Sequence, residues 1–281
     1  MKRIDLHVHT TCSDGTVQPE GIPPLAKAAG LSAVAVTDHD TVAGLAAAMA
    51  AGAECGVEVV PGIEFATGFE HTEIHLLGYL FDPASPALTP ALRWVIDDRR
   101  ERNEKMAALL RADGVPVTAG ELYARYPHST VGRPHFAVKL MECGLAASVA
   151  DAFQKYLAPG RKYYVRRHFL PVDEAVRVVR AAGGRAVLAH PFQYQYDDAQ
   201  LRRLLDYCVS VGLEGLECLY TGYTPRQETY LTALAGEYGL FVTGGSDFHG
   251  GHKPEIALGT GAGDLCVPYE LLEKMRGNAA G

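Results

Sequence analysis

Short apolar runs alternate with alanine-rich runs of helical length along this chain, and this alternation limits its possible folds more than any other feature. The segment 32–37 (SAVAVT) is almost wholly apolar, as expected of a strand that is buried on both faces. Strands of this kind that alternate with helices are typical of βα units around a parallel sheet. We predict strands at 3–7, 32–37, 58–64, 72–80, 185–189, 215–219 and 240–243, and helices at 24–29, 41–53, 172–182, 198–211 and 225–238.

The number of predicted strands favours a barrel. Seven parallel strands are one short of the eight-stranded (β/α) barrel and more than a doubly wound sheet usually has, so we predict an α/β fold, a distorted seven-stranded (β/α)7 barrel. The rhythm breaks after the fourth strand, where the sequence predicts helices at 88–112, 119–125, 134–143 and 147–157. We therefore expect a barrel formed by 1–84 and 171–281, with an inserted helical subdomain at 85–170.

Charge is divided unevenly between these two parts. The whole chain has 281 residues with 26 Lys and Arg against 33 Asp and Glu, but residues 85–170 hold 14 basic and 8 acidic residues. On composition alone, the basic segment is either a solvated helix surface or a region that binds anions.

The composition excludes several classes of protein. Hydrophobic residues make up 48% of the chain, which excludes disorder, and no apolar run is long enough to cross a membrane. The first residues contain no apolar signal-peptide core, so we expect a cytoplasmic protein. The six cysteines are scattered, and we expect them to be reduced thiols.

Residue types that bind metals lie at the ends of the predicted strands: His7, His9, Asp14, His39, Glu64, His75, His190, Asp247 and His249. In a parallel barrel these ends converge on one face, where such barrels place their active sites. Six imidazoles and three carboxylates so close together need cations among them, and nine ligands are too many for one ion. We predict two or three divalent ions, with Glu64 able to bridge a pair.

Single motifs within this set remain ambiguous. His7 and His9 could be hydrogen-bonded polar residues at a strand end, and Asp40 could cap the next helix. Ser13 and Ser246 are interpreted as turn residues, since neither lies in the setting of a nucleophile elbow. Contributions from five separate strand ends make a metal site the stronger interpretation.

These motifs carry a family resemblance. The segments 7–10 (HVHT), 13–15 (SDG), 37–40 (TDHD), 62–64 (GIE), 189–191 (AHP) and 246–249 (SDFH) resemble those of the polymerase and histidinol phosphatase (PHP) superfamily. The inserted helices after the fourth strand, with the segments 132–137 (GRPHFA) and 163–165 (YYV), resemble a narrower branch. That branch contains stand-alone phosphoesterases that act on 3',5'-bisphosphonucleotides and on the 5' ends of short RNAs.

The resemblance implies a trinuclear site with an assigned ligand set. One ion would be held by His7, His9, Glu64 and Asp247, a second by Glu64, His75 and His190, and a third by Asp14, His39 and His249. Among these ligands, Asp14, His39, Glu64 and Asp247 are expected to act in catalysis. Manganese is the expected metal, and iron and zinc also suit such mixed nitrogen and oxygen ligands.

The predicted activity is hydrolysis of a phosphate ester by a metal-activated water, on small nucleotides such as 3',5'-bisphosphonucleotides and, as a second substrate, short 5'-phosphorylated RNA. The candidate substrate-binding residues are Arg99, Arg102 and Asn103 on one predicted helix and Arg133 and His135 at the start of another. The remaining basic and histidine side chains are expected at the surface: Arg161, Lys162, Arg166, Arg167, His71, His128, His168 and His252. Tyr163 and Tyr164 either stack on a base or pack in the core.

Two other functions remain open at this stage. A histidinol-phosphate phosphatase would use the same barrel for a smaller substrate, and a non-catalytic metal-binding module would use no substrate at all. The helical insertion argues against the first and the full ligand set against the second. No membrane interaction and no obligate protein partner are expected.

Overall fold

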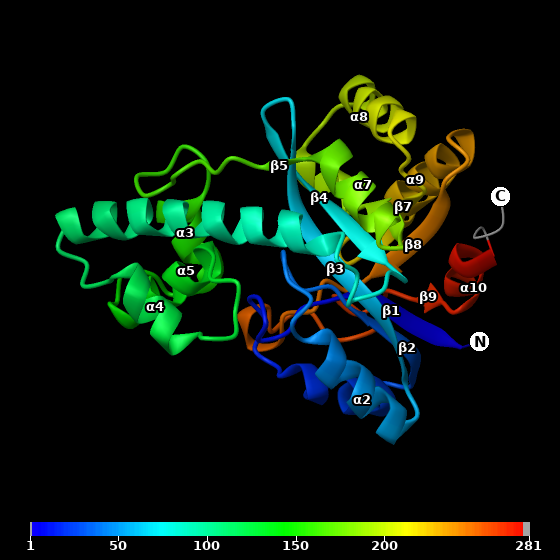
Figure 1. The fold of residues 1–281 in the computed structure, drawn as a ribbon, viewed down its shortest axis with the longest axis horizontal. Coiled ribbons are helices and arrows are strands. Elements are labelled where there is room, and N and C mark those ends of the chain that lie inside the picture. Colours follow the sequence, from blue (N-terminus) through cyan, green and yellow to red (C-terminus); the bar gives the residue numbers. More distant parts are fainter. Residues whose placement is uncertain (1, 278–281) are drawn as a thin grey trace.

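The computed structural model describes residues 2–277 (Figure 1). Within that range, nine strands form one sheet: β1 (Arg3–Val8), β2 (Leu31–Val36), β3 (Glu58–Phe69), β4 (Thr72–Tyr79), β5 (Leu170–Pro171), β6 (Arg185–Leu188), β7 (Gly215–Tyr220), β8 (Phe241–Gly245) and β9 (Val267–Pro268). The α-helices of the same range are α1 (Ile22–Ala28), α2 (Leu45–Cys55), α3 (Leu88–Ala112), α4 (Ala119–Arg125), α5 (Arg133–Glu142), α6 (Val149–Ala152), α7 (Val172–Ala181), α8 (Asp198–Ser210), α9 (Pro225–Glu237) and α10 (Glu270–Gly277).

The sheet curves into a nearly closed barrel. Its strand order is β8-β7-β6-β4-β3-β2-β1-β9, and β5 pairs with β3 outside this path. The barrel closes between β1 and the segment after β8, where Val8 and Phe248 form a parallel bridge and His9 N donates to Phe248 O at 2.9 Å. The fold is therefore a mixed α/β barrel, as predicted in outline.

The prediction of seven parallel strands is wrong in number and in direction. Strand β4 is antiparallel to both of its neighbours, β3 and β6, and β9 is antiparallel to β1. Only Glu70 and His71 separate β3 from β4, and so short a connection permits only a hairpin. The strands β5 and β9 have two residues each, too few to produce a periodic pattern, and α10 was also not predicted.

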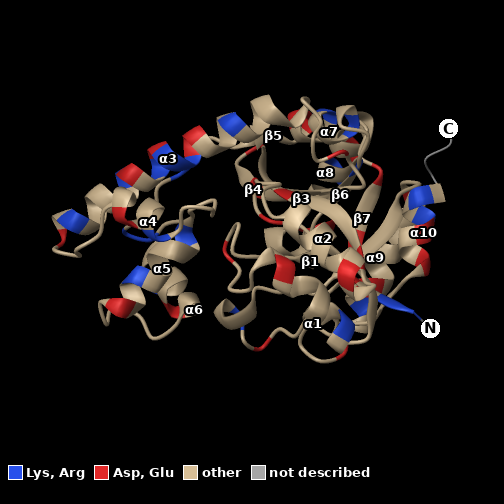
Figure 2. Ribbon diagram, turned by 60° about the horizontal axis from the view of Figure 1, so that its bottom comes forward, with Lys and Arg blue, Asp and Glu red and all other residues tan. Residues whose placement is uncertain are grey.

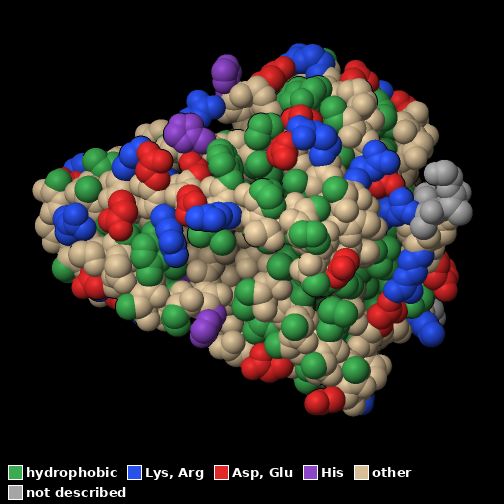
Figure 3. Space-filling model, viewed as in Figure 1, with side chains coloured by type: hydrophobic (Ala, Val, Ile, Leu, Met, Phe, Trp, Pro, Cys, Tyr) green, Lys and Arg blue, Asp and Glu red, His purple; other side chains and the backbone are tan. Residues whose placement is uncertain are grey.

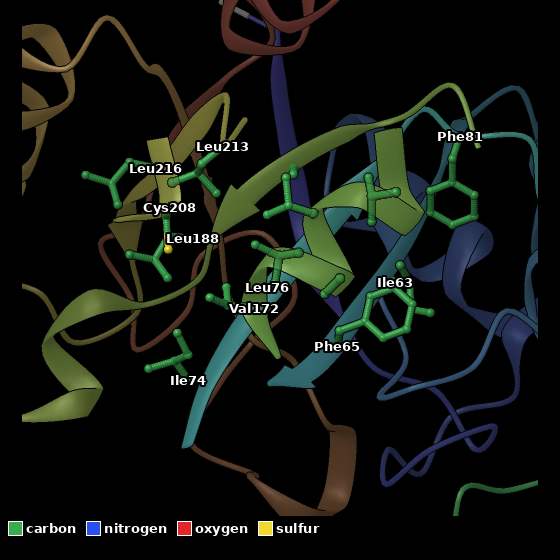
Figure 4. Packing of buried hydrophobic residues seen from close by; sticks show 14 of the residues in the cluster. Ile63, Phe65, Ile74, Leu76, Phe81, Val172, Leu188, Cys208, Leu213 and Leu216 are labelled. Atoms are coloured by element: carbon green, nitrogen blue, oxygen red, sulfur yellow. The ribbon is translucent and has the colours of Figure 1, made fainter. Parts of the chain in front are cut away.

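Both faces of the strands are buried, which explains their continuous apolar sequences. On β4, Leu76 belongs to the cluster between the sheet and the helices, whereas Leu77 belongs to a second cluster that includes Leu272 and Met275 of α10. Figure 4 shows Leu76 in the first cluster together with Phe65 of β3. Burying one such side chain contributes about 2 kcal/mol, so these two layers hold the strand ends in fixed positions.

Helices α3 to α6 project to one side of the barrel and have a core of their own (Figure 1). Met106 and Leu110 of α3 pack there with Leu122 of α4 and Phe136 of α5. The predicted helix at 147–157 is instead the short α6 followed by a π-helical turn at Phe153–Leu157. On the face drawn in Figure 3, acidic and basic side chains lie next to each other along this part of the surface.

Two expectations from composition concern the chain as a whole. None of the helices within residues 2–277 is both long and apolar enough to cross a membrane. All six cysteines are free thiols, as predicted.

Candidate metal centre

All nine predicted ligands lie together at one end of the barrel. They come from β1 and the loop after it, from the loops after β2, β6 and β8, and from β3 and β4. The structure groups their ligand atoms, each group within 4.8 Å, as follows: His9, Asp14, His39 and His249; His7, Glu64 and His190; His7, His9 and Asp247; and His39, Glu64 and His75.

Glu64 lies at the middle of this arrangement. It is fully buried on β3, and its two oxygens face different histidines. Around Oε2 lie His7 Nε2 at 3.3 Å, His9 Nε2 at 3.2 Å and His39 Nδ1 at 3.1 Å. Around Oε1 lie His75 Nδ1 at 2.8 Å and His190 Nε2 at 2.9 Å. One carboxylate thus joins two sets of nitrogen ligands, the arrangement of a bridging ligand.

The remaining carboxylates lie on either side of Glu64. Asp247 Oδ1 is 3.2 Å from His9 Nε2, and Asp14 Oδ1 is 3.3 Å from His249 Nε2. Every oxygen and nitrogen involved is of a type that binds first-row transition metals.

Several of these atoms are buried and lack a hydrogen-bond partner among residues 2–277: His7 Nε2, His9 Nε2, His39 Nδ1, Asp14 Oδ1 and Glu64 Oε2. A buried polar atom without a partner costs free energy, so such a cluster is unfavourable unless another group satisfies it. All five atoms belong to the metal-ligand groups. The residues present therefore fit divalent cations.

The carboxylates of the cluster are ionised. Burial alone would raise the pKa of Glu64, but the nearby His39, His75 and His7 hold it well below its ordinary value. Asp247 is similar: burial opposes ionisation, yet Lys253 and His249 lower its pKa well below the ordinary value. Anionic oxygens are the state that metal binding requires.

Behind the ligands lies a buried carboxylate that the sequence analysis missed. Glu217 of β7 accepts a hydrogen bond from His7 Nδ1 at 2.9 Å and another from the backbone N of His190 at 2.8 Å. It therefore holds two candidate ligands at once. Its signal in the sequence was a single charge within an otherwise apolar strand.

Asp247 also contacts two groups that were not predicted. Lys253 Nζ and the hydroxyl of Tyr220 both lie 2.7 Å from its Oδ2, and both side chains face the adjoining cavity. Asp247 itself has a φ of 57°, in the left-handed region that non-glycine residues rarely adopt, and His190 has a φ of 25°. Strained backbone at two candidate ligands is typical of functional sites.

The metal cluster opens into a cavity of about 570 Å³ between the barrel and the insertion. Four arginines line it: Arg99, Arg102, Arg133 and Arg167. The cavity thus combines the acidic and imidazole groups of the barrel with basic groups from outside it.

Three of these arginines have acidic partners. Arg99 Nε donates to Asp40 Oδ2 at 2.8 Å, and Arg167 contacts both that oxygen, at 3.4 Å, and Asp98. Asp40 therefore does not cap the next helix, whose N-cap is Gly44. Arg167 is buried, which corrects its assignment to the surface.

Arg133 is held by an ion pair and by two rings. Its Nη2 lies 2.9 Å from Glu73 Oε2, and its guanidinium lies over the rings of Phe153 and Tyr164. These contacts fix the guanidinium at the cavity wall.

Arg102 differs from the other three. Its side chain is only 4% exposed, its Nε is buried without a hydrogen-bond partner, and no acidic group among residues 2–277 forms an ion pair with it. Burial, reinforced by the positive charges of Arg99, Arg133 and Arg167, lowers the pKa of Arg102 well below its ordinary value. A buried cation without a partner is unfavourable unless an anion satisfies it.

The structure does not bring Asn103 and His135 to the described lining of the cavity. Asn103 Nδ2 donates to Val131 O at 2.9 Å, and His135 Nδ1 accepts from Gly132 N at 3.0 Å. Burial lowers the pKa of His135 to about 4, so its ring is neutral at physiological pH. Both side chains support the loop before α5.

The remaining tyrosines and histidines that the sequence analysis considered lie in three places: the insertion core, the region of the cavity and the surface. Tyr163 is buried in the insertion core and donates to Asp113 at 2.7 Å, whereas Tyr164 contacts Arg133. His252 lines the cavity and its Nδ1 donates to Asp14 O at 2.7 Å, so its assignment to the surface is wrong. The other three are exposed, as predicted: His71, His128 and His168.

A barrel with this ligand cluster at one end defines a class of metal-binding α/β proteins, and comparison with known proteins identifies the family. Residues 5–128 match the PHP domain family. The chain is 35% identical over 247 residues to the 5'-3' exoribonuclease Rnm of Escherichia coli, covering 87% of this chain and 84% of the relative. It is 34% identical over 251 residues to a 3',5'-nucleoside bisphosphate phosphatase of Chromobacterium violaceum, covering 89% and 88%.

Solved structures agree with this. A candidate metal-dependent phosphoesterase from Bifidobacterium adolescentis superimposes with a TM-score of 0.87 at 32% identity, over 98% of this chain and 95% of that one. An amidohydrolase from Chromobacterium violaceum, solved with bound sulfate and no metal, gives a TM-score of 0.86 at 31% identity, over 98% and 96%. The chain belongs to the PHP domain family, which confirms the resemblance seen in its motifs.

Proposed function

We propose that this protein is a metal-dependent phosphoesterase that hydrolyses small nucleotides with two phosphates, such as 3',5'-bisphosphonucleotides, and also trims short 5'-phosphorylated RNA. The observation that carries the proposal is one cavity lined by two kinds of group that suit a phosphate. A cluster of metal ligands lies at one side, and the unpaired, buried Arg102 lies at another. The names of the two relatives describe substrates of these kinds.

The proposed cofactor is a set of three divalent ions, with manganese first and iron or zinc as alternatives. The first would be held by His7, His9, Glu64 and Asp247, the second by Glu64, His75 and His190, and the third by Asp14, His39 and His249. Bound divalent ions supply positive charge that polarises a phosphoryl group and lowers the pKa of a water molecule. The short distances around both Glu64 oxygens support its role as the bridge.

The side chains around this centre have separate roles. Glu64, with Asp14, His39 and Asp247, would hold the ions that bind the reacting phosphate. Lys253 and Tyr220, which both contact Asp247, hold that carboxylate in position.

The two parts of the chain divide the work. Residues 1–84 and 171–281 would form the barrel that carries the metal centre, and 85–170 a helical subdomain that recognises the substrate. The separate core of α3 to α6 supports this division. Since Arg99 and Arg133 are already paired with Asp40 and Glu73, Arg102 is the principal anchor for the phosphate that is not hydrolysed.

The test compares kcat/KM of the manganese-loaded protein for four compounds: adenosine 3',5'-bisphosphate, adenosine 3'-monophosphate, adenosine 5'-monophosphate and histidinol phosphate. We expect the bisphosphate to be preferred by at least about 10-fold, because a second charge-assisted contact contributes about 1.5 to 3 kcal/mol. In Arg102→Met that preference should disappear, whereas Arg93→Met, outside the cavity lining, should keep it. Equal values for mono- and bisphosphates in the wild type would contradict the proposal, and preference for histidinol phosphate would replace it.

A further inference from the structure

One part of the cavity lining is apolar, and the metal centre and the arginines do not account for it. Four residues of the insertion form it: Pro134 of α5, Val149 and Ala150 of α6, and Phe153 at the start of the π-helical turn. We call these four residues the apolar wall. The metal ligands and the four arginines line the same cavity.

The apolar wall is accessible to a ligand. Ala150 is exposed and Val149 and Phe153 are only partly buried, whereas Ala152 and Leu157 of the same segment are fully buried. Val149 and Phe153 also pack against the insertion core, so they lie between that core and the cavity. Phe153 begins the π-helical turn, in which Ala158 N donates to Phe153 O at 3.0 Å. Single π-helical turns are frequent at functional sites.

The Phe153 ring is also fixed in place. The guanidinium of Arg133 lies 5.6 Å from its centroid, and Arg133 is held in turn by Glu73. A ring held from one side by a paired arginine loses little freedom when a ligand contacts it. It is therefore suited to bind a flat, apolar group.

We propose that the apolar wall is the binding site for the nucleobase of the substrate, and that it recognises the base by contact with its faces and not by its edges. This inference rests on the proposed phosphoesterase activity and specifies its substrate. A molecule whose phosphates occupy the metal centre and Arg102 must place its remaining part within the same cavity. The four side chains of the wall carry no hydrogen-bonding group, so they bind all four bases alike.

The apolar wall would also distinguish a nucleotide from other phosphate esters. An amino alcohol or a bare sugar phosphate has no flat apolar surface to bury there, whereas each nucleobase has one. A protein that used only the metal centre and the arginines would gain nothing from the base.

The experiment measures kcat/KM for the 3',5'-bisphosphates of adenosine, guanosine, cytidine and uridine, and for 1,4-anhydroribitol 3,5-bisphosphate, which keeps the sugar and phosphates but lacks the base. We expect the base to raise kcat/KM by about 10-fold or more, since stacking on an aromatic side chain contributes about 1 to 3 kcal/mol per base. The four nucleotides should agree within about fivefold.

Three variants test the wall itself through the ratio of kcat/KM with and without the base. In Phe153→Ala this ratio should fall towards 1. In Phe153→Tyr, which keeps an aromatic ring, the ratio should stay near the wild-type value. Ala150→Glu provides a second test that leaves the insertion core intact, because Ala150 is exposed, and it should lower the ratio too. Trp94→Ala removes another aromatic ring of the insertion, 41% exposed and outside the cavity lining, and should leave the ratio unchanged.

The outcomes separate this inference from the proposal on which it rests. Equal hydrolysis of the nucleotides and the base-free compound would overturn the nucleobase site and leave the phosphoesterase proposal standing. A strong preference for one base would show that edges are read and would overturn recognition by the faces. Hydrolysis of none of the five compounds would overturn both proposals.

Discussion

Each imidazole of the metal centre has a second nitrogen, and what that nitrogen contacts decides how the ring is held. Nδ1 of His7 donates to the buried Glu217, and Nδ1 of His249 to the backbone oxygen of Asp247. A carboxylate behind a ligating histidine fixes the ring and raises its basicity. Glu217 is the more influential partner, because it also accepts from the backbone of His190.

We therefore expect Glu217→Gln to weaken metal binding about 10- to 100-fold while the fold is kept, since glutamine is nearly the same size but uncharged. Titration calorimetry with Mn²⁺ on the chelator-treated protein measures this directly. Glu237→Gln, at an ion pair on the surface of α9, is the matched control and should bind Mn²⁺ like the wild type. Wild-type affinity in Glu217→Gln would show that His7 needs no such partner.

The convergence of the nine candidate ligands was predictable from the sequence, whereas the residues that contact them from behind were not. His190 and Asp247 each lie two residues after the end of a strand. In a barrel the strand ends lie close together whatever the length and path of the loops between them. Glu217 and Lys253 depend on side-chain directions across the barrel, which no local pattern encodes. Three of the four cavity arginines were found by charge and Arg167 was not, and only the structure distinguishes the unpaired Arg102 from the paired Arg133.

At the scale of elements, closure of the barrel depends on one close approach. A Cβ atom at Gly245 of β8 would overlap with the Cβ and the backbone N of His7 on β1. Because β1 and the residue after it carry the candidate ligands His7 and His9, and the segment after β8 carries two more, the spacing of these strands sets the geometry of the centre.

Gly245→Ala should consequently lower the free energy of unfolding by about 1 to 3 kcal/mol, the usual cost of overpacking, and should weaken Mn²⁺ binding. Denaturant unfolding and calorimetry measure the two effects. Gly236→Ala in α9 is the control: nothing lies within 4 Å of its added Cβ, and alanine in a helix stabilises by about 0.5 kcal/mol or more. Unchanged stability in Gly245→Ala would mean that β8 can move away from β1 without cost.

Most elements were predictable because their local signals agree with their surroundings. Helix α4, for example, begins with a capping box between Thr118 and Glu121, and its predicted bounds of 119–125 are those observed. Strand β4 is antiparallel to β3 because the connection between them is too short for a parallel crossover. The pattern of apolar residues along a strand carries no information about its direction. Strand β9 exists only because β1 offers it an edge, and pairing of that kind has no local signature.

For the molecule as a whole, Asp40 is the main link between barrel and insertion. Its carboxylate, on the loop after β2, receives Arg99 from α3 and Arg167 from the segment before β5. Burial would raise the pKa of Asp40, but Arg99 and Arg167 hold it below the ordinary value. The ion pairs are therefore fully formed at neutral pH.

Asp40→Asn should destabilise the protein by about 3 to 5 kcal/mol, because it leaves the largely buried Arg99 without a counterion and leaves Arg167 with Asp98 alone. Because the pKa of Asp40 is lowered in the folded state, its ionised carboxylate stabilises the wild-type protein fully at pH values above the ordinary pKa of an aspartate. The variant lacks this contribution. The gap between variant and wild type should narrow as the pH falls through the lowered value. Urea unfolding at pH 7 and at successively lower pH measures this gap. Glu101→Gln, at an exposed ion pair, should unfold like the wild type. A constant gap across that range would exclude ionised Asp40 as the link.

The unequal distribution of charge between the two parts has a consequence for the rate at which ligands arrive. Figure 2 shows Lys and Arg along α3 and near α5, on the side of the molecule that carries the net positive charge. Polyanions approaching by diffusion are attracted first to this side, and salt screens that attraction over roughly 8 Å at physiological ionic strength. Encounter should therefore slow as salt is added, lowering kcat/KM, while kcat at saturation stays nearly constant because the buried arginines are little screened.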